Sequence, residues 1–259
     1  MWCHPPTAPT SSRATASTRP PPGTPTGRAG RWTTPGRADS TRSPTRATAT
    51  RGDPRVTPAE FATLLRERAT TGQARLLVGI AGEPGSGKST LAAHLAAALA
   101  PDAVVLPMDG FHLPQSRLVE LGRRERMGAP DTFDVAGFRA VLAAVRRDAG
   151  EVAAPGFDRE VEEAVPGAVG IRPEHRIVLV EGNYLLHDAD GWEGVAALLD
   201  VRAYLAIDPR IRLDRLVARH VAHGKTPDAA RAWATGPDEA NAALIRRGAD
   251  RAEVLLAVD

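Results

Sequence analysis

Short apolar runs alternate with amphipathic stretches along the chain from about residue 57 onward. A short, uninterrupted apolar run is typical of a parallel strand that is buried on both faces. Such runs occupy 76–81, 103–106, 177–180, 201–207 and, more weakly, 254–257. Apolar residues at helical spacing predict helices near 89–99, 134–147, 209–222, 226–234 and 237–247. Strands that alternate with helices predict an α/β fold, in which helices cover both faces of a parallel sheet.

The predicted folded domain covers residues 56–259 and begins with a helix. Thr57 is a candidate N-cap, Pro58 takes the first helical position, and Glu60 completes a capping box. We therefore expect a helix from Pro58 to about residue 70, ahead of the first long strand.

Residues 1–55 differ in composition from the rest of the chain. They consist mostly of Thr, Ser, Pro, Arg and Gly, and they hold ten of the 22 prolines. Such a segment cannot bury enough apolar surface to offset the entropy of ordering it, so we predict a disordered basic tail. A dispensable tail or a translation start assigned too far upstream is the simplest interpretation. An organellar transit peptide is an alternative, although the prolines disfavour the amphipathic helix that it needs.

The net charge of +2 is unevenly distributed along the chain. Residues 1–53 hold eight Arg and only two Asp, so the rest of the chain is mildly acidic. This argues against nucleic-acid binding by the folded domain and leaves it as an alternative for the tail alone. The single cysteine, Cys3, excludes an internal disulfide. No stretch approaches 18 uninterrupted apolar residues, so we expect a cytoplasmic protein without a membrane partner.

Residues 82–89, GEPGSGKS, match the phosphate-binding pattern G-x-x-x-x-G-K-[ST] at every fixed position. The glycines let successive backbone N–H groups point at phosphate oxygens, Lys88 reaches the β and γ phosphates, and the Ser89 hydroxyl can ligate Mg²⁺. A predicted strand precedes the motif and a predicted helix follows it, which favours a nucleotide site over a structural turn. The predicted ATP-binding residues are Gly82, Gly85, Ser86, Gly87, Lys88, Ser89, Thr90 and, from a lid described below, Arg215.

Two carboxylates are predicted at the same edge of the sheet, where ligands sit in open α/β folds. Asp109 follows the strand 103–106, and an aspartate there can accept the proton of an attacking hydroxyl. Glu181 ends the strand 177–180, where it can bind Mg²⁺ together with Ser89 or orient the acceptor. A turn or cap role for Asp109 and a solvated strand end for Glu181 are the alternatives.

Four segments of the chain resemble the uridine kinase, pantothenate kinase and phosphoribulokinase group of P-loop kinases. They are 82–89, 109–112 (DGFH), 128–134 (GAPDTFD) and 180–186 (VEGNYLL). The resemblance covers about residues 74–257. It implies a P-loop NTPase three-layer sandwich with a five-stranded parallel sheet in the order 2-3-1-4-5 and a small helical lid. It also implies the use of ATP and Mg²⁺, the role of base for Asp109, and a homodimer, since relatives of this group often form dimers or tetramers.

The resemblance points to residues on the acceptor side as well. Phe157 lies where uridine kinases carry a Tyr that touches the acceptor, and Arg159 could hold an anionic acceptor or the moving phosphoryl group. Loop packing is the alternative for Phe157. Asp134 also fits a purely structural N-cap. The predicted acceptor-binding residues are His112, Phe157, Arg159, Asn183 and Tyr184, with Trp233 and Asn241 as weaker candidates.

Three arginines in the predicted helix 209–222 suggest a lid. Arg212, Arg215 and Arg219 are spaced three and four apart, so they share one helix face. The segment 219–225 resembles the arginine-bearing lid of this group, which closes over ATP and excludes water. Arg219 is the preferred candidate for spreading the charge of the transferred phosphoryl group. A solvated basic face is the alternative.

Lys88, Asp109, Glu181 and Arg219 together predict an ATP-dependent kinase that phosphorylates a hydroxyl of a small molecule. Nucleosides, pantothenate-like compounds and sugars are the acceptors to consider. A nucleotide-dependent regulator of a protein partner is the alternative from another class. The acceptor-side residues and the absence of a guanine-reading N-K-x-D motif argue against that alternative.

Overall fold

The computed structural model describes residues 55–71, 75–147, 150–158 and 160–257. The predicted basic tail lies outside the described residues, except for Arg55. The described residues belong to one compact unit.

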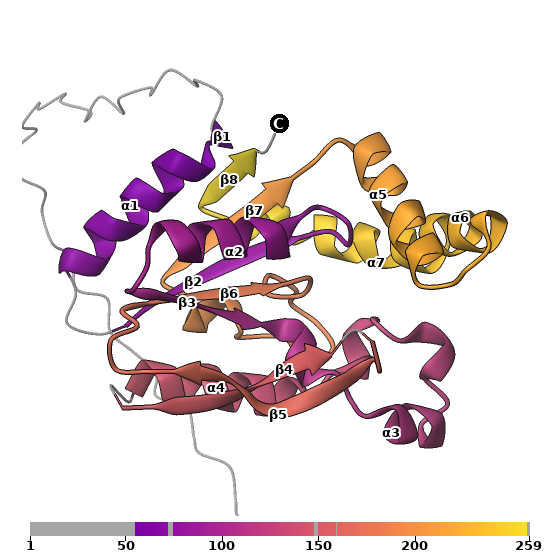
Figure 1. Cartoon of the computed structure of the whole chain (residues 1–259), viewed down its shortest axis with the longest axis horizontal. Coiled ribbons are helices and arrows are strands. Elements are labelled where there is room, and N and C mark those ends of the chain that lie inside the picture. Colours follow the sequence, from indigo (N-terminus) through magenta and orange to yellow (C-terminus); the bar gives the residue numbers. More distant parts are fainter. Residues whose placement is uncertain (1–54, 72–74, 148–149, 159, 258–259) are drawn as a thin grey trace, which may run out of the picture. The chain divides into compact units, whose positions relative to one another are not determined.

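A parallel six-stranded sheet forms the centre of this unit (Figure 1). Its spatial order is β1-β8-β7-β2-β6-β3, and all neighbouring strands are parallel. The strands are β1 (Arg55–Val56), β2 (Leu76–Gly82), β3 (Ala103–Pro107), β6 (Ile177–Gly182), β7 (Val201–Ala206) and β8 (Val254–Ala257). The five strands expected from the apolar runs stand in the order 2-3-1-4-5, so the predicted fold class is confirmed.

The sheet has six strands rather than the predicted five, because β1 pairs with β8 through Arg55 and Val56. A strand of two residues has no periodicity that a sequence pattern could reveal. β1 leads directly into α1 (Pro58–Thr71), where the predicted capping box forms. The Thr57 backbone N–H donates to Glu60 Oε2 (2.9 Å), and the Glu60 N–H donates to Thr57 Oγ1 (3.3 Å).

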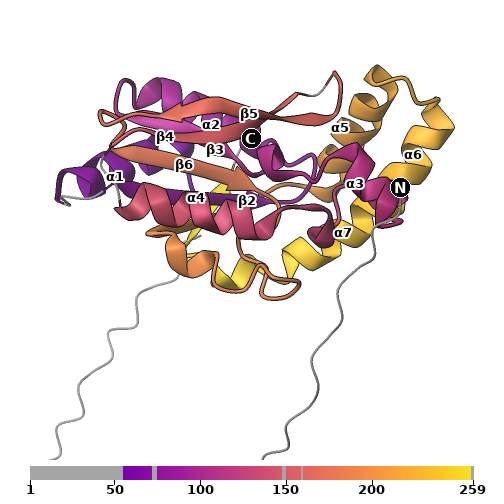
Figure 2. The ribbon, with the colours of Figure 1, turned by 90° about the horizontal axis from the view of Figure 1, so that it is seen from below.

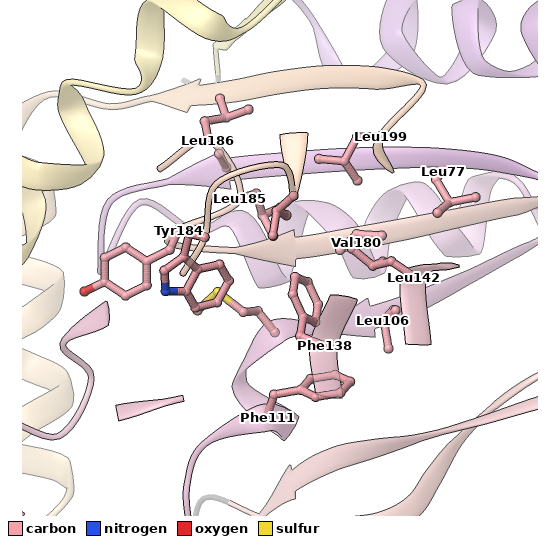
Figure 3. Packing of buried hydrophobic residues seen from close by; sticks show 14 of the residues in the cluster. Leu77, Leu106, Phe111, Phe138, Leu142, Val180, Tyr184, Leu185, Leu186 and Leu199 are labelled. Atoms are coloured by element: carbon pink, nitrogen blue, oxygen red, sulfur yellow. The ribbon is translucent and has the colours of Figure 1, made fainter. Parts of the chain in front are cut away.

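Helices cover both faces of the sheet (Figures 1 and 2). On one face α1 and α2 (Lys88–Ala98) share a hydrophobic cluster with Ile177 and Leu179 of β6. On the other face α4 (Val135–Arg147) shares a second cluster with Val178 and Val180 of β6, and Figure 3 shows this cluster from close by. Successive side chains from Ile177 to Val180 therefore enter opposite clusters, which explains why this part of β6 is apolar at every position.

Three helices follow β7 and gather near the carboxyl ends of the central strands (Figure 1). They are α5 (Pro209–Ala222), α6 (Pro227–Thr235) and α7 (Pro237–Arg246), each beginning with proline at its first position. Asp208 caps α5 by accepting a hydrogen bond from the Arg210 N–H (2.7 Å). Both Figure 1 and Figure 2 place α3 (Gln115–Glu120) at the same end of the sheet as α6 and α7.

An antiparallel hairpin of β4 (Val152–Asp158) and β5 (Glu163–Ile171) was not predicted. Most of β5 is not buried, and both strands contain Gly, Ala and Pro, so no clear apolar alternation marks them. The hairpin packs on the 3₁₀ turn Met108–Phe111. A Cβ atom on Gly110 would lie 2.2 Å from the Pro155 carbonyl oxygen, so only glycine permits this contact.

Candidate active site

A cavity of about 310 Å³ lies where β2, β3 and β6 end. It receives residues from the phosphate-binding loop, from the turn after β3, from the hairpin and from the three C-terminal helices. We call it the main cavity. It is lined by Pro84, Lys88, Ser89, Asp109, His112, Arg124, Met127, Gly128, Phe133, Phe157, Glu162, Asn183, Arg219, His220, His223, Lys225, Trp233, Asp238 and Asn241.

The phosphate-binding loop connects β2 to the start of α2, as its sequence predicts. Gly85 and Gly87 have φ angles of 81° and 92°, which glycine adopts without strain. Ser86 is fully buried between them, and its hydroxyl oxygen has no hydrogen-bond partner among the described residues. A buried polar atom without a partner fits a loop that is completed by a bound phosphate. The loop therefore fits ATP.

Ser89 and Glu181 meet beside this loop. The Ser89 hydroxyl donates a hydrogen bond to Glu181 Oε1 (3.0 Å), and Glu181 is buried although it carries a carboxylate. A hydroxyl and a carboxylate at this distance are oxygen ligands of the kind that Mg²⁺ prefers. The two residues thus fit the predicted metal site.

Asp109 lies in the 3₁₀ turn after β3 and His112 directly follows that turn, and both line the main cavity. His112 Nδ1 lies 2.8 Å from the Asp109 carbonyl oxygen, which fixes the imidazole against the turn. The close packing of Gly110 against Pro155 of β4 also holds this turn against the hairpin. The structure therefore brings Asp109 into one cavity with Lys88 and Ser89.

Aromatic rings form one wall of the main cavity. The His112 ring centroid lies 4.0 Å from that of Phe133 and 4.9 Å from that of Phe157. Phe157 comes from β4 of the hairpin, so the predicted acceptor-side role agrees with its position. Asn183, directly after β6, also lines the cavity, and its Oδ1 is buried without a hydrogen-bond partner among the described residues.

The tip of the hairpin closes this wall by binding α3 and the segment after it. Gln115 Nε2 donates to the Glu162 carbonyl oxygen (3.1 Å), and the Gln115 N–H donates to Glu163 Oε1 (3.1 Å). Arg124 forms an ion pair with the Glu162 carboxylate at 3.4 Å. Glu162 has a φ of 53°, an unusual value for a residue other than glycine.

Arg215 and Arg219 project from α5 toward the phosphate-binding loop. Arg215 Nη1 donates to the Ser86 carbonyl oxygen (3.3 Å). A second cavity of about 240 Å³ is lined by both arginines together with Gly85, Gly87, Lys88, Ser89 and Thr90. Arg219 lines both cavities, so it lies between the predicted nucleotide side and the predicted acceptor side.

Arg212 does not belong to this group, contrary to the prediction of a three-arginine lid face. Its side chain is 3% exposed and forms ion pairs with Glu83 (3.0 Å) and with Glu239 of α7. The Arg212 guanidinium therefore binds two protein carboxylates, and Arg212 lines neither cavity.

The prediction that Tyr184 contacts the acceptor is also not supported. Tyr184 is fully buried in the second hydrophobic cluster (Figure 3). It does not line the main cavity. Its hydroxyl donates to the Gly128 carbonyl oxygen (2.7 Å), so it supports the cavity wall at Gly128 from behind. Burial, followed by the charge of Asp238, raises the Tyr184 pKa above its ordinary value. The remaining acceptor candidate, Arg159, lies outside the described residues.

Several cavity residues were missed by sequence reasoning. Two of them form a hydrogen-bonded pair, in which His220 Nε2 lies 2.7 Å from Asp238 Oδ2. Another is Lys225, whose Nζ lies 4.5 Å from the centroid of the Trp233 ring. The weaker candidates Trp233 and Asn241 do line the cavity. Histidine and aspartate in helices carry no distinctive local pattern, so only the tertiary fold reveals such a pair. The other missed residues are Pro84, Arg124, Met127, Gly128, Phe133, Glu162 and His223.

Among the described residues, no helix is both long enough and apolar enough to span a membrane.

Comparison with known proteins identifies the family. Residues 77–258 match the sequence model of the phosphoribulokinase / uridine kinase family. A Schizosaccharomyces pombe protein named "Putative uridine kinase" is 36% identical over 162 residues, which cover 59% of this chain and 69% of that protein. A pantothenate kinase from Leifsonia xyli is 32% identical over 143 residues, covering 52% and 44% of the two chains.

A solved structure agrees with this assignment. The crystal structure of a "putative fructose transport system kinase" from Silicibacter sp. TM1040 has a TM-score of 0.72 to this chain at 41% sequence identity. The match covers 79% of this chain and all of that one. Together with the P-loop geometry and the parallel sheet of predicted order, these matches show that the chain is a P-loop kinase of the phosphoribulokinase / uridine kinase family.

Proposed function

We propose that the protein uses ATP and Mg²⁺ to phosphorylate a hydroxyl group of a small molecule that binds in the main cavity. The observation that carries this proposal is the meeting of Lys88, Ser89 and Asp109 in one cavity with an aromatic wall. The phosphate-binding loop would hold ATP, and Asp109 would face the acceptor hydroxyl in the same cavity.

In the proposed reaction, Asp109 accepts the proton of the acceptor hydroxyl as its oxygen attacks the γ-phosphorus of ATP. The bond from that phosphorus to the β–γ bridging oxygen breaks, and ADP leaves with the electron pair. Lys88 and Arg219 stabilise the charge on the transferred phosphoryl group, and Arg215 binds the nucleotide phosphates. Mg²⁺, when bound by Ser89 and Glu181, would neutralise charge on the phosphate oxygens.

The acceptor is proposed only as a class. His112 and Phe157 offer ring faces, and Asn183 offers an amide oxygen that has no hydrogen-bond partner in the described part of the chain. These groups suit a compact molecule that carries several polar groups. The names of the three relatives mention uridine, pantothenate and fructose, so these compounds are the first acceptors to test.

An acceptor screen tests the proposal. The full chain is incubated with ATP and Mg²⁺ and with a panel of nucleosides, pantothenate analogues and free sugars, and acceptor-dependent release of ADP is measured. A compound that is phosphorylated identifies the acceptor. If ATP binds but no compound of the panel is phosphorylated, and ATP-dependent binding of a protein is found instead, the regulatory alternative replaces the kinase.

Asp109→Asn is the matched variant for this screen. Because the amide keeps the shape of the side chain but cannot take a proton, turnover is expected to fall by about 10²- to 10⁴-fold. Since Asp109 does not belong to the phosphate-binding loop, the affinity for ATP should stay near that of the unchanged protein. Turnover equal to that of the unchanged protein would remove Asp109 from the role of base. A homodimer and a cytoplasmic location also remain predictions, to be checked by light scattering and by cell fractionation.

A further inference from the structure

Glu83 is the second residue of the phosphate-binding loop, and the proposed reaction gives it no role. Its side chain is only 13% exposed. Arg212 Nε lies 3.0 Å from Glu83 Oε2, and Arg246 Nε donates to Glu83 Oε1 at 2.9 Å. The Tyr204 hydroxyl of β7 also donates to Glu83 Oε1, at 3.2 Å. A loop residue thus binds α5 through Arg212, α7 through Arg246 and the sheet through Tyr204.

A second carboxylate completes the arrangement. Glu239 of α7 binds both Arg212 and Arg246, the latter at 2.8 Å. We call these four residues, Glu83, Arg212, Glu239 and Arg246, the Glu83 network. Their charges alternate in sign and sum to zero. Hydrogen bonds from Arg246, with a further contribution from Arg212, lower the Glu239 pKa below its ordinary value, in keeping with a carboxylate that stays ionised.

The network fixes one end of a helix face that continues over the phosphates. Leu216 packs on the loop, since a Cβ atom on Gly85 would lie 2.8 Å from Leu216 Cγ. Arg215 Nη1 binds the Ser86 carbonyl oxygen, and Arg219 follows one turn later. Because Arg212, Arg215, Leu216 and Arg219 are three or four residues apart, an anchor at Arg212 sets the position of the other three.

We propose that Glu83 is a positioning residue, which anchors α5 on the phosphate-binding loop so that Arg215 and Arg219 face the nucleotide phosphates. This inference rests on the proposed function, because it assigns those two arginines to ATP. Glu83 acts through α5 and touches no substrate. Its removal should therefore weaken ATP binding only as long as the arginines on α5 are present.

A double-mutant cycle on ATP affinity tests this dependence. Dissociation constants for ATP are measured by calorimetry for the unchanged chain, Glu83→Gln, a variant that carries both Arg215→Ala and Arg219→Ala, and the variant that combines all three changes. Glu83→Gln is expected to weaken ATP binding by about tenfold, and to add little once both arginines are absent, since residues that act through one another are not additive. Unchanged ATP affinity in Glu83→Gln, or effects that simply multiply in the combined variant, would overturn the proposal.

Glu253→Gln is the matched control. Glu253 also binds an arginine, Arg202 (2.9 Å), but directly before β8 and away from the loop, so the same substitution should leave ATP affinity unchanged. If Glu83→Gln does not fold, Glu239→Gln replaces it, because this carboxylate lies on the more exposed side of the network and should give a smaller loss in the same direction.

Hydrogen exchange separates this inference from the proposed function. Without any ligand, the amides of α5 should exchange faster in Glu83→Gln than in Glu253→Gln. If α5 exchanges equally in both variants, Glu83 does not anchor the helix. A chain that binds ATP and shows the expected cycle, but phosphorylates no acceptor, would contradict the kinase proposal and leave the anchoring role of Glu83 supported.

Discussion

Gly85 shows at the scale of one residue how tightly the phosphate-binding loop and α5 fit together. Its φ of 81° is costly for any other residue, and an added Cβ atom would meet Leu216 Cγ at 2.8 Å and the Arg212 carbonyl oxygen at 3.0 Å. Gly85→Ala should therefore lower the free energy of unfolding by more than the roughly 1–2 kcal/mol of backbone strain alone, and should weaken ATP binding. Thermal unfolding and ATP titration measure the two effects.

Gly122→Ala is the control for Gly85→Ala. Gly122 also has a positive φ, 64°, but an added Cβ atom would meet nothing within 4 Å. This variant should show the strain alone and bind ATP normally. Equal losses of stability in the two variants, with ATP binding retained in both, would mean that α5 yields easily and does not press on the loop.

Sequence patterns named most of the residues that line the two cavities but could not set the direction of every side chain. Lys88, Ser89 and Asp109 were predicted because their positions follow from a motif or a strand end, and Arg219 because the segment 219–225 resembles a lid. Tyr184 lies in a correctly identified segment, yet its ring turns into the core. Arg212 shares a helix face with Arg215, yet α7 supplies carboxylates that attract it, and contacts between distant helices leave no local signal.

At the scale of elements, the capping box of α1 makes a prediction that is independent of the site. Thr57 Oγ1 accepts the Glu60 N–H, and Glu60 in turn accepts the Thr57 N–H. Thr57→Ala removes one of these bonds and should lower the free energy of unfolding by about 1 kcal/mol, with ATP affinity unchanged. Urea unfolding measures the loss.

Thr63→Ala is the control for the capping box. Thr63 is exposed within the same helix, and its hydroxyl donates only to the Ala59 carbonyl oxygen (3.1 Å). Because alanine favours the helix interior, this variant should be neutral or slightly more stable. A loss as large as that of Thr57→Ala would show that the helix is sensitive to any threonine and that the cap has no special role.

The elements that sequence predicted and those that it missed differ in how completely they are buried. β2 and β6 are buried on both faces, so they leave uninterrupted apolar runs. The predicted helices α5, α6 and α7, which follow β7, each begin with proline and show amphipathic spacing. The hairpin β4–β5 has one partly buried side and β1 has two residues, and neither geometry imposes a pattern strong enough to recognise.

At the scale of the whole molecule, stability at high pH depends on the only two tyrosines of the chain, Tyr184 and Tyr204. Both are buried, and burial is the main cause that raises the pKa of each hydroxyl above its ordinary value of 10. For Tyr204 the nearby Glu83 carboxylate raises the pKa further. The folded protein therefore keeps both hydroxyls protonated at a pH where the unfolded chain loses these protons.

The sign of the pH effect follows from this difference. Above pH 10 the unfolded state binds fewer protons than the folded state, so the free energy of unfolding falls as pH rises. Each tyrosine contributes a slope of up to about 1.4 kcal/mol per pH unit, and below pH 10 neither contributes a slope. Urea unfolding at a series of alkaline pH values measures this decline, which should be shallower in Tyr184→Phe.

Tyrosinate absorbance gives an independent reading, because it should rise together with unfolding. Absorbance that rises near pH 10 while the circular dichroism of the fold is intact would mean that water reaches these hydroxyls, and that the core around Tyr184 and the contact between Tyr204 and Glu83 are looser than the structure describes.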